Sequence, residues 1–273
     1  MKSGAQQSLP IGIFDSGLGG LTVLKELRRH LPHEHFVYLG DTARTPYGSK
    51  GKETIQRYSR ECAQFLLSKE IKLLVVACNT SSSLALDVLC NELPCPVIGT
   101  IEPAVSEALT VPNASKIGVI GTKATIASGA YEAMLHRRSS RLSVVAKACP
   151  LFVPLVEEGI CSGPVTKAVI ELYLETFRID PVDALILGCT HYPLLGSQIG
   201  EFLGSSTRIV ECSKAVAAAV ANELSSRGLC TPGEPSAGGT EQYFVTDDVG
   251  RFNSLAALFL ESGKVAAAKV DAL

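Results

Sequence analysis

Short apolar runs rich in Val, Ile and Leu recur along the chain and alternate with stretches of helical periodicity. The runs predict strands at residues 10–15, 35–40, 71–78, 95–100, 115–121, 142–146, 183–189, 207–212 and 242–246. They are continuously apolar rather than alternating, which is typical of parallel strands that are covered on both faces. Helical patterns lie between them, for example over 21–31, 53–69, 165–177 and 214–226. The pattern therefore predicts an α/β fold with mostly parallel, helix-flanked sheets.

The apolar runs also contain a weak internal repeat. The segment IGIFDSGLGGLTVLKEL (11–27) resembles IGVIGTKATIASGAYEAML (117–135), and LLVVACNTSSSLAL (73–86) resembles ALILGCTHYPLL (184–195). The two matches have nearly the same offset along the chain, so we expect two pseudo-symmetric lobes. Each would have one strand that ends in a small polar loop and one that ends in Cys. Chance similarity between apolar strands is the alternative.

The length of 273 residues also favours two lobes, because it exceeds the common size of one domain. We assign residues 1–98 and 208–273 to a discontinuous first lobe and residues 99–207 to the second, with the active site between them. The segment TPGEPSAGG (231–239) is rich in Gly, Pro and Ser, and we expect it to be a loop before the last strand.

Composition narrows the class of protein. Hydrophobic residues make up 46% of the chain and charged residues 19%, which is typical of a well-buried globular protein. The net charge of −2 and the lack of a Lys/Arg block argue against a nucleic-acid partner. The first ten residues lack the apolar core of a signal peptide, and no apolar run reaches the ~18 residues of a membrane helix. We therefore expect a soluble cytoplasmic protein without a membrane partner.

The chain has nine cysteines, an odd number, and no CxxC pair. This argues against a zinc ribbon and against a thioredoxin-type centre. A reducing cytosol would keep them as thiols, most of them buried as small hydrophobic side chains. Only their positions can show which are chemically active.

In open α/β sheets, ligands bind at the carboxyl ends of the strands. The first strand ends in Asp15-Ser16-Gly17-Leu18-Gly19-Gly20, whose glycines allow a tight turn with main-chain N–H groups facing an anion. The segment does not fit the dinucleotide-binding fingerprint, because Thr22 stands at its last glycine position. A plain Gly-rich turn is the alternative.

The second strand end with polar side chains is DTARTPYG (41–48). Pro46 and Gly48 predict a turn there that can present Tyr47 to a ligand. The alternative is a surface loop with an Asp41–Arg44 ion pair.

The third strand ends at Cys78, and a helix follows within a few residues, with Asn79, Thr80 or Ser81 as its expected N-cap. A thiol beside a helix N-terminus is close to the positive end of the helix dipole. We therefore expect this position to favour the thiolate. A buried structural thiol is the alternative.

The fourth strand end is Cys189-Thr190-His191, again before a predicted helix, with Pro193 suited to its first turn. Cys189 and His191 could be metal ligands, but His191 is the only histidine in these motifs, so we predict no metal site. A structural thiol again remains the alternative for Cys189 taken alone.

Two thiols on opposite lobes, with a ligand between them, suit proton removal from one face of a carbon and proton delivery to the other. That reaction is racemisation or epimerisation. A pseudo-symmetric site fits it because the reverse reaction uses the same groups in exchanged roles.

The chain resembles the glutamate racemases of the aspartate/glutamate racemase superfamily from about residue 11 to 260. The motifs that carry the resemblance are GIFDSGLGGLTV, GDTARTPYG, VVACNTSS, PVIGTIEPA, IGVIGTKATI, CPLFVPLVEEG and LGCTHYPLL. The resemblance implies a cofactor-independent, PLP-free enzyme that interconverts L- and D-glutamate between two lobes. The D form would feed peptidoglycan synthesis.

The resemblance also implies roles for single residues. Cys78 would deprotonate D-glutamate with the help of Asp15, and Cys189 would deprotonate L-glutamate with the help of His191. Glu157 matches an acidic residue on the histidine side, with Glu158 as a neighbouring candidate. The positions that match substrate contacts are Asp15, Ser16, Tyr47, Gly48, Asn79, Thr80, Thr122, Thr125, Thr190 and His191.

Some positions depart from the family pattern. Thr100 and Ala104 stand where the family often has Val and Gly, and Glu211-Cys212 replaces a more common Asp-Ser. We expect none of these residues to touch the catalytic core.

Three alternative functions compete with that of a glutamate racemase. An aspartate racemase or a maleate-isomerase-like enzyme would also use paired cysteines, and a two-lobed small-molecule binding protein would share the architecture without the chemistry. The motifs TARTPYG and CTHYP favour glutamate. A homodimer is an assembly that the sequence leaves open.

Overall fold

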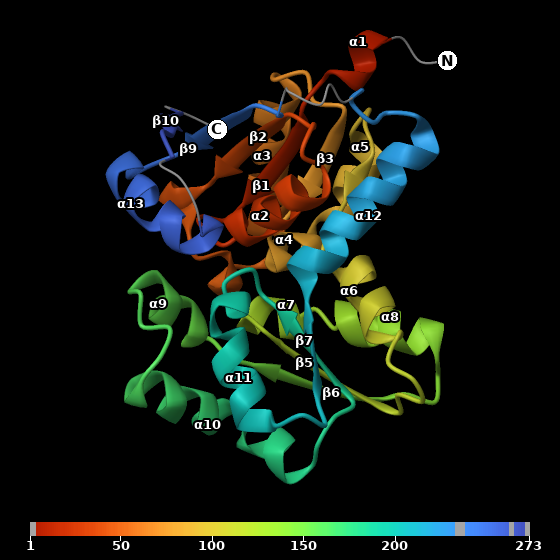
Figure 1. The fold of residues 1–273 in the computed structure, drawn as a ribbon, viewed down its shortest axis with the longest axis vertical. Coiled ribbons are helices and arrows are strands. Elements are labelled where there is room, and N and C mark those ends of the chain that lie inside the picture. Colours follow the sequence, from red (N-terminus) through yellow and green to blue (C-terminus); the bar gives the residue numbers. More distant parts are fainter. Residues whose placement is uncertain (1–3, 233–237, 262–264, 271–273) are drawn as a thin grey trace.

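The computed structural model describes residues 4–232, 238–261 and 265–270, and it has two sheets, one in each half of the molecule (Figure 1). The first sheet has the strand order β10-β9-β2-β1-β3-β4, and all its paired strands are parallel. Its strands are β1 (Ile11–Asp15), β2 (Phe36–Gly40), β3 (Leu73–Val76), β4 (Val97–Ile98), β9 (Glu241–Val245) and β10 (Ala268–Lys269).

The second sheet has the order β6-β5-β7-β8 and is also parallel throughout. Its strands are β5 (Lys116–Gly121), β6 (Ser143–Ala148), β7 (Ala184–Gly188) and β8 (Arg208–Glu211). The predicted α/β class with mostly parallel sheets is confirmed, and each of the nine predicted strand segments overlaps a strand. The short edge strand β10 was not predicted.

The two sheets share one topology. The order β2-β1-β3-β4 in the first sheet corresponds strand by strand to β6-β5-β7-β8 in the second. This correspondence pairs β1 with β5 and β3 with β7, which are the strands that the internal repeat relates. The predicted pseudo-symmetry of the lobes is therefore confirmed.

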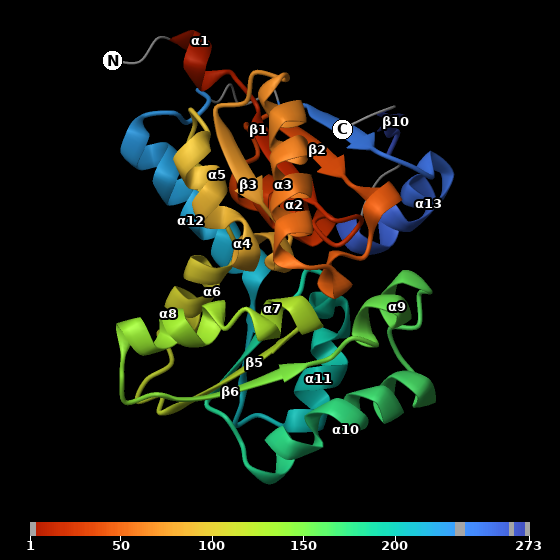
Figure 2. The ribbon, with the colours of Figure 1, turned by 180° about the vertical axis from the view of Figure 1, so that it is seen from behind.

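Helices cover both faces of each sheet (Figures 1 and 2). Those around the first sheet are α1 (Gly4–Gln7), α2 (Leu21–His30), α3 (Lys52–Leu67), α4 (Asn79–Leu84), α5 (Leu86–Glu92), α12 (Cys212–Arg227) and α13 (Val249–Leu260). Those around the second are α6 (Ile101–Ala108), α7 (Lys123–Ala127), α8 (Ala130–Arg138), α9 (Phe152–Glu157), α10 (Pro164–Ile179) and α11 (Gly196–Leu203). Three 3₁₀ helices, η1 (Thr42–Arg44), η2 (Tyr47–Ser49) and η3 (Tyr192–Leu195), lie in the strand-end loops.

The apolar strands supply the core because both faces are buried. All five residues of β1, of β2 and of β7 are buried. Helix α3 covers one face of the first sheet (Figure 2). On that face, Phe14 and Val76 pack in one cluster with Leu66 of α3. On the other, Ile13 packs in one cluster with Leu24 of α2. The packing therefore places the polar strand ends, rather than the strands themselves, where a ligand can reach them.

We predicted that the chain returns to the first lobe between residues 207 and 208, and this boundary is wrong by one strand. We assigned residues from 208 onward to the first lobe, but β8 pairs in parallel with β7 in the second sheet. We therefore propose that the chain passes between the lobes twice, once between β4 and α6 and again between β8 and α12. Of the predicted loop at 231–239, residues 233–237 lie outside the described part of the structure.

Within the described residues, no helix is both long enough and apolar enough to cross a lipid bilayer.

Gly40 sets the approach of two strand-end loops. A Cβ atom at Gly40 would lie 2.6 Å from the carbonyl oxygen of Gly17, in the turn after β1. We predict that Gly40→Ala shifts this turn and lowers the free energy of unfolding by about 1–3 kcal/mol, the usual cost of overpacking. Urea unfolding followed by circular dichroism measures the change.

Gly238→Ala is the matched control, because Gly238 is exposed and a Cβ atom there meets nothing within 4 Å. Its stability should stay within about 0.5 kcal/mol of the parent, as is usual for substitutions at the surface. Equal stability of the two variants would contradict the proposed contact.

Candidate active site

The strand ends of both lobes meet at one small pocket. It is lined from the first lobe by Ser16, Thr45, Pro46, Tyr47, Gly48, Cys78, Asn79 and Thr80, and from the second by Thr122, Val153, Cys189, Thr190 and His191. Its volume is about 20 Å³, roughly the space of one water molecule. A ligand as large as an amino acid needs more space than this, so the pocket must widen before such a ligand can bind.

Cys78 and Cys189 occupy matching places in the two lobes. Cys78 follows β3 and immediately precedes α4, while Cys189 follows β7 and precedes η3. Both are free thiols, both are buried, and both line the pocket. Pro193 lies in the first turn of η3 as expected. The N-cap of α4 is Cys78 itself, so the expected caps Asn79, Thr80 and Ser81 were each placed too late.

Burial changes the acid–base behaviour of both thiols. It raises the pKa of Cys78, and the negative charge of Asp15 raises it further, while hydrogen bonds from Ser81 and Ser16 act in the opposite direction. Burial raises the pKa of Cys189 well above its usual value, against a hydrogen bond from the backbone N–H of His191. Burial of Cys78 therefore opposes the thiolate form that the helix N-terminus favours.

Asp15 ends β1 and is completely buried. Its carboxylate accepts a hydrogen bond from the backbone N–H of Gly17 at 2.8 Å and one from the Thr190 hydroxyl at 3.3 Å. Burial raises its pKa, while His191 and the hydrogen bonds lower it. Asp15 thus links the first lobe to the Cys189 loop, and burial of its carboxyl group favours the protonated form.

His191 lies between Cys189 and an acidic residue. Its Nδ1 atom lies 3.9 Å from the Cys189 sulfur, and its Nε2 atom lies 3.2 Å from Glu157 Oε1. Burial raises the pKa of Glu157, but the hydrogen bond and charge of His191, together with Arg251, lower it below its ordinary value. Glu158 is instead exposed and pairs with Arg251. The structure thus places Glu157, rather than Glu158, against the histidine.

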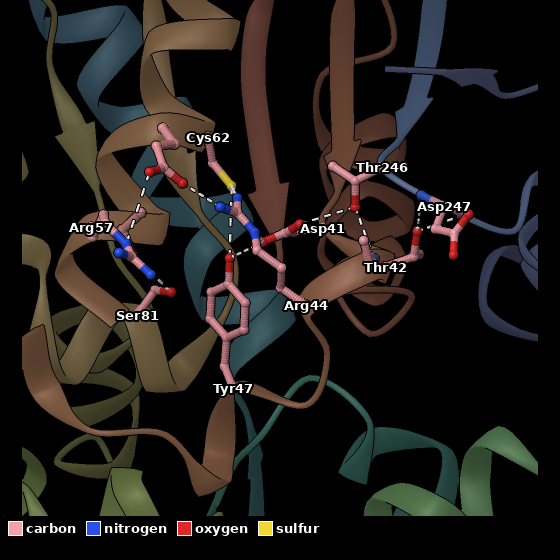
Figure 3. Close-up of polar contacts among 12 residues, drawn as sticks. Asp41, Thr42, Arg44, Tyr47, Arg57, Cys62, Ser81, Thr246 and Asp247 are labelled. Carbon is pink, nitrogen blue, oxygen red and sulfur yellow. Dashed lines mark hydrogen bonds and ion pairs between the residues drawn. The ribbon is translucent and has the colours of Figure 1, made fainter. Parts of the chain in front are cut away.

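The loop after β2 is held by a buried polar network (Figure 3). Asp41 accepts hydrogen bonds from the hydroxyl groups of Tyr47 and Thr246 and forms an ion pair with Arg44. Arg44 also pairs with Glu61 on α3. Because the Tyr47 hydroxyl donates its hydrogen to Asp41, it has no hydrogen left to donate to a carboxylate of a ligand. The predicted Asp41–Arg44 pair thus exists, but it anchors a pocket loop.

Three threonines named as substrate contacts lie together across the lobes. The hydroxyl of Thr80 lies 3.0 Å from that of Thr122 and 3.2 Å from that of Thr125. Thr125 is buried and does not line the pocket. A Cβ atom at Gly48 would lie 2.5 Å from Thr122, so the absence of a side chain there allows the lobes to close.

Asn79 lies next to three residues that were not expected at the site, namely Thr100, Tyr131 and Cys212. Its Oδ1 atom accepts hydrogen bonds from Thr100 and Tyr131 and lies 3.7 Å from the Cys212 sulfur. Its Nδ2 atom is buried and has no hydrogen-bond partner among the described residues. The expectation that Thr100 and Cys212 stay clear of the catalytic core is therefore wrong. Their departure from the family pattern was the signal, but sequence spacing could not place them beside Asn79.

In the described part of the chain, no group of three or more His, Cys, Asp or Glu side chains is arranged to hold a metal ion.

Fold and site together define an α/β protein with two matching lobes and a buried thiol from each lobe at one pocket. The sequence model of the Asp/Glu/hydantoin racemase family matches residues 19–221. The chain belongs to this family.

Relatives with a curated description support the assignment. The glutamate racemase of Aquifex aeolicus is 54% identical over 220 residues, 81% of this chain and 85% of that protein. The glutamate racemase of Geobacter metallireducens is 49% identical over 237 residues, 87% of each. The crystal structure of glutamate racemase from Francisella tularensis in complex with D-glutamate has a TM-score of 0.89 at 36% identity and covers 97% of this chain and 98% of that chain.

The contact between His191 and Glu157 generates a prediction. Glu157→Gln removes the negative charge beside the imidazole, so His191 should be a weaker acid–base partner for Cys189. We expect turnover of the substrate to fall by about ten- to a hundredfold, part of what acid–base catalysis contributes. Steady-state kinetics in both reaction directions measure the loss.

Glu158→Gln is the matched control. Glu158 is the neighbouring carboxylate, and its hydrogen bond is to Arg251, whereas that of His191 is to Glu157. It should retain activity within about twofold, the loss of one exposed ion pair. A larger loss in this control than in Glu157→Gln would contradict the assignment.

Proposed function

We propose that the chain is a cofactor-independent amino-acid racemase that interconverts L- and D-glutamate through Cys78 and Cys189. The observation that carries the proposal is the pair of buried thiols at the carboxyl ends of the corresponding strands β3 and β7, both lining one pocket. Similarity to glutamate racemases over most of the chain supports glutamate as the substrate.

The proton balance of the reaction needs one thiolate and one thiol. The thiolate removes the proton from Cα of glutamate, and the carbanion that forms takes a proton from the thiol on its opposite face. The roles of the two sulfurs are then exchanged, and the reverse reaction begins from that state. We assign Cys78 to D-glutamate and Cys189 to L-glutamate.

The neighbours of the thiols suit this exchange. Because burial raises the pKa of both thiols, a productive site needs groups that accept or stabilise a proton beside each sulfur. Asp15, with its raised pKa, serves Cys78, and His191, supported by Glu157, serves Cys189. Exclusion of water strengthens these interactions in the closed pocket.

The substrate brings two carboxylates and an ammonium group. We assign its carboxylates to the hydroxyl, amide and main-chain N–H groups of the strand-end loops. The candidate contacts are Ser16, Tyr47, Gly48, Asn79, Thr80, Thr122, Thr125, Thr190 and His191, with Asp15 facing the ammonium group.

The product D-glutamate would supply peptidoglycan synthesis, and we propose a cytoplasmic location for the enzyme. A homodimer also stays a prediction. Exposed apolar residues recur every seven positions along α10, at Val165, Leu172 and Ile179. A contact with a second copy of the chain would be tested first at these residues.

The two-thiol reaction predicts the behaviour of Cys78→Ala and Cys189→Ala. Each should lose racemisation by at least about a hundredfold, since general acid–base catalysis supplies 10²–10⁴ of the rate. Circular dichroism follows D-to-L and L-to-D conversion, and deuterium from D₂O should enter at Cα in the parent enzyme. A chelator should leave the rate unchanged.

Cys149→Ala is the matched control, because Cys149 is another buried free thiol of the second lobe but does not line the pocket. It should keep racemase activity. Full activity of either active-site variant, or loss of activity with the chelator, would refute the two-thiol reaction. Ligand binding with equal affinity in parent and variants, without turnover, would support the binding-protein alternative.

The substrate assignment predicts discrimination against aspartate, which is one methylene shorter. Donors spaced for both carboxylates of glutamate cannot all meet those of aspartate, and one missing methylene changes kcat/KM by about 10–200-fold. Parallel assays with both amino acids test this. A higher kcat/KM for aspartate would favour the aspartate-racemase alternative, and turnover of maleate would favour the isomerase.

A further inference from the structure

The side-chain amide of Asn79 is held on its oxygen side by residues from distant parts of the chain. Oδ1 accepts a hydrogen bond from the Thr100 hydroxyl at 2.9 Å and one from the Tyr131 hydroxyl at 2.6 Å. All three side chains are buried. In this arrangement both hydroxyl groups donate to the amide oxygen, which leaves the NH₂ group on the opposite side of the amide.

Cys212 supports this arrangement rather than supplying its main donor. Its sulfur lies 3.1 Å from the carbonyl oxygen of Leu187 and 3.3 Å from the Tyr131 hydroxyl, but 3.7 Å from Asn79 Oδ1. Burial raises its pKa to about 12, so the group is a neutral thiol with one hydrogen. The shorter contact to Leu187 is the better place for that hydrogen. Cys212 therefore packs against Tyr131 and fixes the position of its hydroxyl.

The NH₂ end of the Asn79 amide is the end that can still donate to a ligand. Asn79 lines the pocket between the two thiols, and its Nδ2 atom is buried without a partner among the described residues. A buried donor without an acceptor costs about 1–3 kcal/mol. A carboxylate in the pocket would remove that cost. An anionic ligand would thus suit this end of the amide once the pocket has widened enough to admit it.

The groups around Asn79 also lie where the chain changes lobes. Thr100 immediately precedes α6 after the chain leaves β4, and Cys212 opens α12 after β8. Tyr131 lies on α8 of the second lobe, whereas Asn79 opens α4 of the first. Thr100 is itself held through its backbone N–H by Ser82 at 3.1 Å. The orientation of one amide thus depends on both crossings between the lobes.

We propose that Thr100 and Tyr131 are positioning residues that aim the Asn79 amide at a carboxylate of the substrate, in the arrangement formed when the lobes close. The inference rests on the proposed function for the identity of the substrate. It adds that the polar group which recognises the carboxylate is set by the two lobe crossings, and not by the first lobe alone.

A double-mutant cycle between Thr100 and Asn79 tests the proposal. Thr100→Val removes one donor with little change in volume, and it should raise the KM for both glutamate enantiomers by about two- to tenfold, the range of one hydrogen bond. The value of kcat should change less than KM. In an Asn79→Ala background, the same change at Thr100 should have almost no further effect, because coupled residues are not additive. Tyr131→Phe should behave in the same way.

Two further variants separate positioning from general stability. Thr100→Ser keeps the hydroxyl and should restore the KM of the parent. Thr207→Val removes another buried threonine hydroxyl, one that donates to the Val182 carbonyl oxygen at 2.9 Å and does not line the pocket. It should lower the melting temperature without changing KM. Failure of Thr100→Ser to restore KM, or an equal rise in KM with Thr207→Val, would overturn the proposal.

Calorimetric binding of glutarate gives a readout that does not need turnover, because glutarate has both carboxylates but no amino group. If the parent racemises glutamate but Thr100→Val has equal effects with and without Asn79, the positioning role is overturned and the proposed function stands. If the parent binds glutarate with the predicted coupling but racemises no glutamate, the positioning role stands and the proposed function fails. A parent that neither racemises glutamate nor binds glutarate overturns both.

Discussion

Two thiols must be kept away from bulk water and yet lie at the same small pocket, and most of the structure follows from this constraint. All strands of a parallel sheet end at one edge, so a single sheet delivers its strand-end groups to one side only. Bringing Cys78 and Cys189 to one pocket from different sheets needs two such edges that face each other. The repeated order β2-β1-β3-β4 and β6-β5-β7-β8 meets that need with one topology used twice.

The same burial opposes ionisation of both thiols in the free protein. Desolvation raises the pKa of both thiols, and the nearby N–H groups of Ser81 and His191 offset only part of this. The surrounding groups therefore matter as much as the sulfurs. Asp15 has a raised pKa and a hydrogen bond to Thr190 of the opposite lobe, so the protonation of one side of the site is sensitive to the position of the other.

Local sequence patterns predicted most of the fold because apolar strands and their polar ends are contiguous in the chain. They led to the nine main strands and to both cysteines, which the structure places at one pocket. They failed where distant contacts decide. The placement of β8 depends on its pairing with β7, and the direction of the Tyr47 hydroxyl depends on Asp41. Burial raises the pKa of Cys78, and a position beside a helix N-terminus does not indicate how deeply the thiol is buried.

Asn79 shows why sequence spacing could not describe the whole site. Thr100, Tyr131 and Cys212 lie 21, 52 and 133 residues from it, and each belongs to a different helix or helix start. A departure from the family pattern at Thr100 or Cys212 looks neutral when each position is judged alone. In the folded chain both residues approach one amide oxygen, and both lie where the chain crosses between lobes. A substitution at one crossing therefore changes the environment of a pocket residue directly, and a change there is best judged together with the residue at the other crossing.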